Sequence, residues 1–170
     1  MIRLMGAALL SAAAVLLGFG SVVRLRRRTE DLRGLRSGLS AMERSLAVRS
    51  APLSEVLQEG AVAACGTSRD FFSFCAKGIP RLEGRPFVTL WEASLEGAPL
   101  TLELEDRRVL AELGPVLGRF DSESQTMALR TAVDRLERQA QEAVEQQRRM
   151  SKVYGSLGIS AGLLLMIILL

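Results

Sequence analysis

The chain of 170 residues contains no histidine and only two cysteines. These two cysteines cannot by themselves supply the four ligands of an ordinary structural zinc site. The absence of histidine also removes the most common general base, and no serine is flanked by a plausible base, so acid–base and nucleophilic catalysis lack their usual groups. The GxxxxGK[ST] pattern of a phosphate loop is absent as well. We therefore expect no enzyme, no metal, no cofactor and no small-molecule substrate.

Long apolar runs occur at the two ends of the chain. Residues 4–23 and 153–170 carry no charged side chain, and a membrane-spanning helix needs about 20 apolar residues to cross a core of about 30 Å. We therefore expect transmembrane segments at residues 1–23 and 153–170, on either side of a helical head at residues 24–152. The alternative for the first run is a secretory signal, although the run exceeds the roughly 7 to 15 apolar residues of a signal core.

Basic residues beside the two runs predict the orientation. Four arginines lie between residues 24 and 28, and three basic residues lie between 148 and 152. Because basic residues near the ends of a span favour the cytoplasmic side, we expect an integral membrane protein with two spans and a cytoplasmic head. The arginines after the first run suit anionic lipid headgroups. No aromatic residues alternate with them, so we expect no nucleic acid.

Apolar residues at spacings of three and four predict two long helices. In the first stripe, Arg28 stands at the one position where the spacing calls for an apolar residue. Pro52 is expected to start the next helix. The two helices should leave the membrane on one side and run antiparallel. The first stripe is Leu25, Leu32, Leu35, Leu39, Met42 and Leu46, and the second is Leu129, Val133, Leu136, Ala140, Ala143, Gln147 and Met150.

The chain between the two stripes predicts four shorter helices. They are expected over residues 53–64, 70–76, 87–96 and 101–113, with Ser68 as the cap of the second. The alternation of residues 101–105 also resembles a strand, but five residues are too few to start a sheet here. The fold class is therefore all-α, a helical bundle between an N-terminal and a C-terminal transmembrane helix.

A corner between two helices is predicted after residue 113. Pro115 should interrupt the preceding helix, and Gly118 can adopt the left-handed conformation that closes a helix. Ser122 and Gln125 have the spacing of a capping box, with Asp121 as an alternative cap. A tight corner is favoured over a ligand site. The residues assigned to this corner are Gly114, Gly118, Asp121, Ser122 and Gln125.

Acidic residues are concentrated between residues 92 and 112, against two arginines. Glu103, Glu105 and Asp106 are the candidate surface for a basic partner, and an ordinary solvated helix face is the alternative. On a helix Glu103 and Glu105 point in different directions, so they do not form a catalytic carboxylate pair.

Two further patterns concern packing. Cys65 and Cys75 should be reduced thiols packed as small apolar residues, with a redox pair as the alternative.

Gly158 and Gly162 form a GxxxG pattern, which lets helices approach closely in lipid. We expect the spans to pack against each other or against other subunits, unless these glycines merely tolerate lipid.

The order of these features resembles the stage III sporulation protein AB family of endospore-forming bacteria. The resemblance covers nearly the full length, and no single motif carries it. It rests on Ile2-Arg3-Leu4-Met5-Gly6-Ala7, Ala51-Pro52-Leu53, Trp91-Glu92, Leu117-Gly118-Arg119-Phe120-Asp121 with Gln125, Leu136-Glu137, and Ser156-Leu157-Gly158.

The resemblance implies a subunit of the mother-cell complex that joins forespore proteins to bridge the two membranes around the forespore. The family is similar to the inner-membrane platform protein of type II secretion systems. The implied function is a non-enzymatic membrane scaffold for a mother-cell-to-forespore channel required for endospore formation. Its implied partners are the secretion-ATPase-like stage III sporulation protein AA, docked on the cytoplasmic face, and other subunits of the complex. The alternative is a membrane-anchored signalling or sensor stalk, which would carry its folded domain outside.

Overall fold

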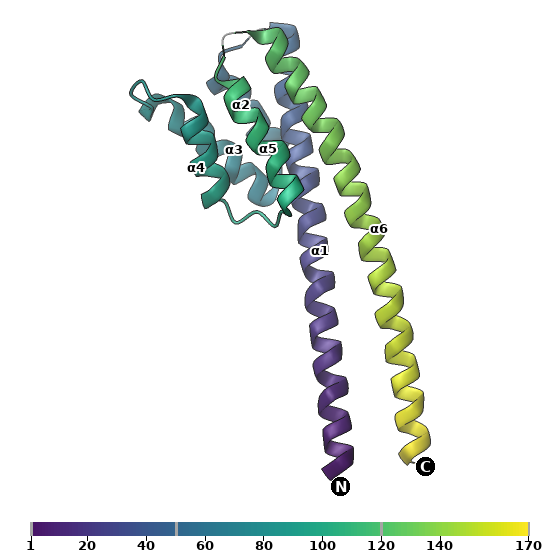
Figure 1. The fold of residues 1–170 in the computed structure, drawn as a ribbon. Helices are drawn as coiled ribbons and strands as arrows, with labels where there is room; N and C mark the ends of the chain where they lie inside the picture. The colour runs from purple at the N-terminus through teal and green to yellow at the C-terminus, as the bar shows by residue number, and fades with distance from the viewer. Residues whose placement is uncertain (1, 50, 120, 170) are drawn as a thin grey trace. The chain divides into compact units, whose positions relative to one another are not determined.

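The computed structural model describes the backbone of residues 2–49, 51–119 and 121–169, and the side chains of residues 23–49, 51–119 and 121–150. Every regular element in these ranges is helical (Figure 1), so the all-α prediction is confirmed. In chain order the elements are α1 (Ile2–Arg49), α2 (Leu53–Ala63), α3 (Gly66–Gly78), the short 3₁₀ helix η1 (Ile79–Arg81), α4 (Phe87–Gly97), α5 (Leu104–Leu117) and α6 (Ser122–Leu169).

The chain divides into two compact units. Unit 1 comprises Met1–Arg27 and Glu142–Leu170, and unit 2 comprises Arg28–Gln141. Among the residues with described side chains, no helix combines the length and the apolar character that a membrane crossing requires. Apart from Val23, the spans expected at residues 1–23 and 153–170 lie outside that range. The packing pair Gly158 and Gly162 also lies outside it, so these assignments stay predictions.

The first heptad stripe forms one side of the core of unit 2. Leu32, Leu35, Leu39 and Met42 on α1 are fully buried. The parts of α1 and α6 within unit 2 run antiparallel (Figure 1). Leu129 and Leu136 of α6 are likewise fully buried. The buried residues of both stripes therefore belong to the core, as their spacing predicts, whereas Leu25, Val133, Gln147 and Met150 are only half-buried.

Two glycines of α1 create room for α3. A Cβ on Gly38 would lie 2.2 Å from Cε2 of Phe72, and a Cβ on Gly34 would lie 2.7 Å from Oγ of Ser68. Real Cβ atoms do not approach so closely. Ser68 lies inside α3, where its hydroxyl donates a hydrogen bond to the carbonyl of Asp31 at 2.9 Å. The prediction that Ser68 caps this helix is therefore wrong, because α3 begins earlier, after Cys65.

Aromatic side chains join α3 and α4. The rings of Phe71 and Trp91 meet edge to face, with 4.9 Å between centroids. The indole N–H of Trp91 donates a hydrogen bond to the carbonyl of Leu110 in α5 at 2.7 Å. This buried donor therefore has an acceptor inside the protein. Gly114 allows this approach, because a Cβ there would lie 2.9 Å from Cδ1 of Trp91.

Helix α5 differs from its predicted range at both ends. It begins at Leu104 and continues through Pro115 to Leu117, so the expected interruption at the proline is wrong. The proline stands in the last turn, where it removes one backbone hydrogen bond shortly before the helix ends. The later start follows from Glu103, which occupies the cap position.

Candidate functional site

A buried ion pair joins α1 to the start of α5 within unit 2. Arg28 binds both carboxylate oxygens of Asp106, with Nε donating to Oδ2 at 2.7 Å and Nη2 donating to Oδ1 at 2.9 Å. Asp106 is 0% exposed and Arg28 is 6% exposed. Arg28 also forms an ion pair with Glu103 at 2.8 Å. This bidentate geometry is the arrangement in which a guanidinium and a carboxylate bind most strongly.

The same carboxylate closes a capping box at the start of α5. The backbone N–H of Glu103 donates to Oδ2 of Asp106 at 2.8 Å, and the Glu103 side chain accepts from the backbone of Asp106 in return. Asp31 of α1 accepts from the backbone N–H of Thr101 at 2.8 Å. Two side chains of α1 thus fix the segment that leads into α5.

These contacts correct the predicted partner surface. Asp106 does not lie on a surface, because its place in the capping box directs the carboxylate back toward the cap, where Arg28 covers it. Glu103 and Glu105 do reach solvent, with side chains 50% and 65% exposed. Leu104 between them is 76% exposed. We call Glu103, Leu104 and Glu105 the acidic ridge, and its role as a partner surface stays a prediction.

The signal for this ion pair was present in the sequence. Arg28 occupies the one polar place in an apolar stripe, and a buried arginine needs an acidic partner. Asp106 follows Glu103 by three residues, which is the spacing of a capping box. Neither pattern alone connects two residues that lie 78 positions apart in the chain.

The corner between α5 and α6 exists, but its residues have other roles than predicted. Gly118 has φ −78° and ψ −2°, so it is right-handed and the left-handed assignment is wrong. Asp121 provides the cap, accepting from the backbone N–H of Glu123 at 3.2 Å and of Ser124 at 3.3 Å. These contacts confirm the alternative cap.

The predicted box between Ser122 and Gln125 is wrong. The Gln125 amide donates to the carbonyl of Leu117 at 2.8 Å and so ties the start of α6 to the end of α5. The hydrogen bond from the Ser124 side chain is the main cause that lowers the pKa of Asp121. These bonds hold two helix ends together, so their role is structural.

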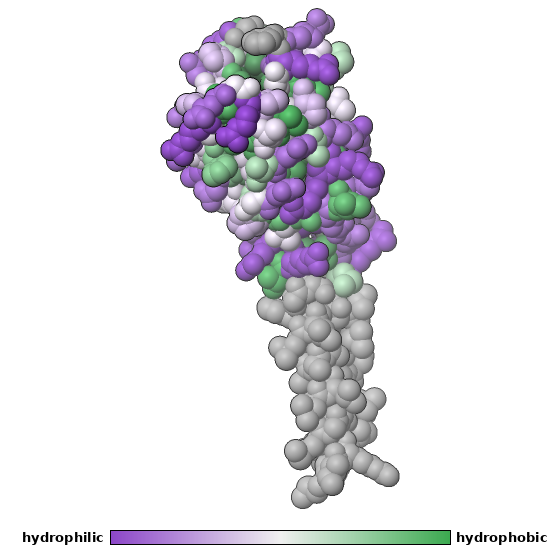
Figure 2. Space-filling view, turned by 60° about the vertical axis from the view of Figure 1, so that its left-hand side comes forward, coloured by the Kyte–Doolittle hydropathy of each residue, from purple (hydrophilic) through white to green (hydrophobic). Residues whose placement is uncertain are grey.

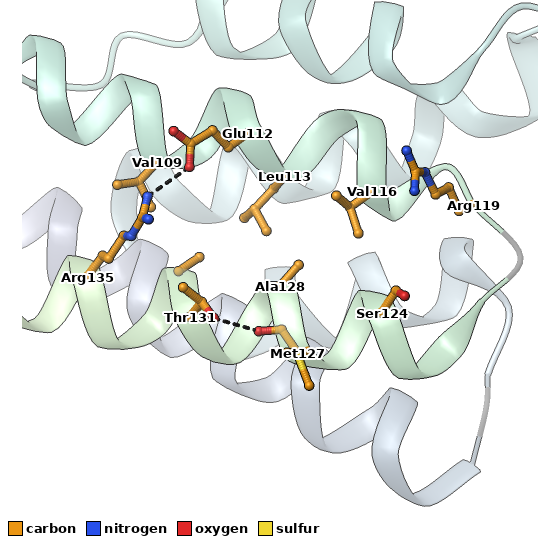
Figure 3. Close-up of a pocket in the computed structure, with 11 residues that line it drawn as sticks. Val109, Glu112, Leu113, Val116, Arg119, Ser124, Met127, Ala128, Thr131 and Arg135 are labelled. Carbon is orange, nitrogen blue, oxygen red and sulfur yellow. Dashed lines mark hydrogen bonds and ion pairs between the residues drawn. The ribbon is translucent and has the colours of Figure 1, made fainter.

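An open groove lies between α5 and α6 (Figure 3). It encloses about 390 Å³, and Val109, Leu113 and Val116 line its α5 side. An ion pair between Glu112 and Arg135, 2.8 Å long, bridges one end. The groove is mostly apolar. Its charged residues at this end, Glu112 and Arg135, pair with each other, and Arg119 lies at the other end.

A second groove lies between α3, η1 and α4 and encloses about 400 Å³. Phe74, Leu82 and Leu90 form its apolar surface, and Phe74 is 60% exposed. Its basic residues are Lys77, Arg81 and Arg85. We call it the basic groove. Figure 2 brings this side of unit 2 forward and shows hydrophilic side chains around smaller apolar patches.

The three basic residues of this groove form no ion pair with any carboxylate in the described part of the chain. They differ in this respect from Arg28, Arg36 and Arg135, each of which binds an acid. The basic groove therefore combines exposed apolar area with three basic side chains that are not engaged in ion pairs among the described residues.

The two cysteines occupy different environments, and both are free thiols. Cys75 is buried, as predicted, and burial raises its pKa to about 11. Cys65 is exposed at the start of α3, so its predicted packing is wrong. Across residues 23–49, 51–119 and 121–150, no group of three histidine, cysteine or acidic residues is placed to hold a metal ion.

Comparisons with known proteins bear on the identity of the chain. The sequence model of the family described as stage III sporulation protein AB matches residues 3–170. Stage III sporulation protein AB of Bacillus subtilis (strain 168) is 28% identical over 172 residues, which covers 100% of both chains. A solved structure of a stage III sporulation protein AB matches with a TM-score of 0.64 and 26% identity, over 72% of this chain and 98% of that chain. The chain therefore belongs to the stage III sporulation protein AB family.

Proposed function

We propose that the chain is a non-enzymatic membrane scaffold subunit of the mother-cell complex that forms a channel to the forespore. Membership in the stage III sporulation protein AB family gives it a role in sporulation, and this observation carries the proposal. The scaffold holds its helical head on the cytoplasmic face of the membrane, on the mother-cell side of the outer forespore membrane. There the head docks a secretion-type ATPase similar to stage III sporulation protein AA, beside other subunits of the complex.

Two sequence features support the membrane part of the proposal. The apolar runs at residues 4–23 and 153–170 have the length of spanning helices. Arginines adjoin the head side of both runs, which is the arrangement that retains a segment in the cytoplasm.

The architecture of unit 2 supports a scaffold role for the head. Its core joins parts of α1 and α6 to the four shorter α-helices between them, and the bidentate pair of Arg28 and Asp106 locks α5 onto α1. A head fixed in this way holds its surface helices in one arrangement. Such rigidity suits a docking platform, because a rigid surface loses little entropy when a partner binds.

Capture of the ATPase tests the docking step. The full-length chain, solubilised in detergent and tagged, should retain the stage III sporulation protein AA of the same organism. Leu110→Asp places an unpaired charge at a fully buried position and should unfold the head and abolish capture. Val62→Asp is the matched control, because Val62 is 77% exposed. Failure of the unaltered chain to retain the ATPase, under conditions where both proteins are folded, would contradict docking.

The alternative function, a sensor stalk, differs in the side of the membrane on which the head lies. A sensor would present the head outside the cell, where a cytoplasmic ATPase cannot reach it. The side of the head therefore separates the two functions without any knowledge of the partner.

A further inference from the structure

The basic groove has the composition of a protein-binding surface. Arginine and aromatic residues are enriched at interfaces and dominate their binding energy. The groove offers Arg81, Arg85 and the exposed ring of Phe74 around one apolar hollow. A ligand that fits it needs an apolar group to fill the hollow and acidic groups to meet the rim.

The acidic ridge of the same chain has this composition. Leu104 is one of the most exposed large apolar side chains in the described part of the molecule, at 76%. It lies between two glutamates that both reach solvent. Within the described residues, the one ion pair of Glu105 is an exposed contact with Arg108 at 3.1 Å. Such a pair is weak enough to be exchanged for another cation.

The ridge and the basic groove belong to different ends of α4. The groove is lined by residues of the first two turns of α4, Thr89, Leu90 and Ala93, together with the end of α3. The ridge follows the end of α4 and starts α5. Two complementary surfaces at separate places on one chain can bind each other only between copies.

We propose that the basic groove of one chain binds the acidic ridge of a second copy. Leu104 of one copy enters the hollow beside Phe74 of the next, and Glu105 pairs with Arg81 or Arg85 on the rim. The contact is heterologous, because the two copies contribute different surfaces. Repetition of such a contact produces a ring when the rotation between copies closes, and an open filament when it does not.

An anionic membrane surface is the competing occupant of the basic groove. The groove is a hollow between helices with an apolar interior, whereas a lipid surface favours projecting basic and apolar side chains. The second copy is therefore the better fit, and lipid binding is an outcome of the test. The proposal does not depend on docking of the ATPase.

Cross-linking between two differently tagged full-length copies in detergent tests the contact. Both copies carry Cys65→Ser, which leaves only the buried Cys75 as a native thiol. One copy carries Arg108→Cys, at an exposed position beside the acidic ridge that leaves Leu104 and Glu105 in place. The other copy carries Ala93→Cys, at an exposed position that lines the groove. A short bismaleimide should join the two tagged chains. Val62→Cys in place of Arg108→Cys is the control, because it is also exposed but lies on α2.

Charge reversal makes the test specific. Arg81→Glu with Arg85→Glu in the Ala93→Cys copy should lower the yield of cross-linked product about tenfold, because like charges then face each other. Adding Glu105→Arg to the Arg108→Cys copy should restore much of the yield. No product above the Val62→Cys control, or a yield that ignores the reversals, would overturn the proposal.

A vesicle-binding assay tests the competing occupant of the basic groove, an anionic membrane surface. The full-length chain in neutral nanodiscs is floated with vesicles that contain phosphatidylglycerol. Vesicle binding that requires Arg81 and Arg85, without cross-linking between copies, would assign the groove to lipid and overturn the second-copy proposal.

Discussion

The substitution Asp106→Asn isolates the buried ion pair between α1 and α5. The amide has nearly the size of the carboxylate, so packing is preserved while the charge is removed. Its NH₂ group would face the guanidinium of Arg28, and one of the two donors that now bind at 2.7 and 2.9 Å would lose its acceptor. Since Arg28 is only 6% exposed, water cannot fully replace the lost acceptor.

The expected loss is moderate. One buried N–H donor of Arg28 loses its present acceptor, which costs about 1 to 3 kcal/mol, while the ion pair with Glu103 at 2.8 Å still compensates part of the charge. At this chain length 1 kcal/mol corresponds to a shift of about 3 °C in the unfolding midpoint, so the midpoint should fall by about 3 to 9 °C.

Thermal unfolding of the full-length chain in detergent, followed by circular dichroism at 222 nm, measures the effect. Glu105→Gln is the matched control, because this neighbouring acid is 65% exposed and should change the midpoint by about 2 °C or less. A midpoint for Asp106→Asn that equals the control would refute the reasoning.

Three other measurements test packing, capping and thiol burial. Gly114→Ala should cost about 1 to 3 kcal/mol, measured by urea unfolding, because the new Cβ would lie 2.9 Å from Cδ1 of Trp91; Gly97→Ala, which meets nothing within 4 Å, is its control and should be close to neutral. Asp121→Ala should lower the unfolding midpoint at neutral pH. Because the folded pKa of Asp121 lies below its ordinary value of 3.8, the difference from the unaltered chain should shrink as pH falls through that lowered pKa, and a difference independent of pH would refute the charged cap. A thiol reagent at pH 8 should modify one cysteine in the folded chain and two in denaturant, because burial raises the pKa of Cys75 to about 11; two fast-reacting thiols in the folded chain would contradict the burial.

The core helices could be predicted because their apolar spacing is a local property. Leu32, Leu35 and Leu39 on α1 are fully buried as their spacing requires. The end of α1 at Arg49 and the start of α2 at Leu53 follow the proline between them. These features depend on residues within a few turns of one another.

The candidate site was harder to predict because its contacts are distant in sequence. Asp106 looks like a surface acid among Glu103 and Glu105 until α5 is placed against Arg28. The basic groove combines residues from α3, η1 and α4, and no single stretch displays it.

The predicted capping box at the start of α6 was wrong for a different reason. Two adjacent residues, Asp121 and Ser122, both suit a helix cap. The choice between them depends on where α5 ends and on the bond from Gln125 to the carbonyl of Leu117. A shift of one residue in the helix start therefore decides whether Asp121 or Ser122 caps α6 and whether Gln125 takes part in that cap.

The side of the membrane on which the head lies tests the central claim most directly. Cys65 is an exposed thiol on the head and Cys75 is buried, so Cys65 reports the location of the head without an added label site. In intact cells that express the full-length chain without forming a forespore, so that the far side of the membrane is the outside of the cell, a membrane-impermeant maleimide should leave Cys65 unmodified. The same reagent should modify Cys65 once the membrane is permeabilised. Modification of Cys65 in intact cells would place the head outside and contradict the scaffold proposal.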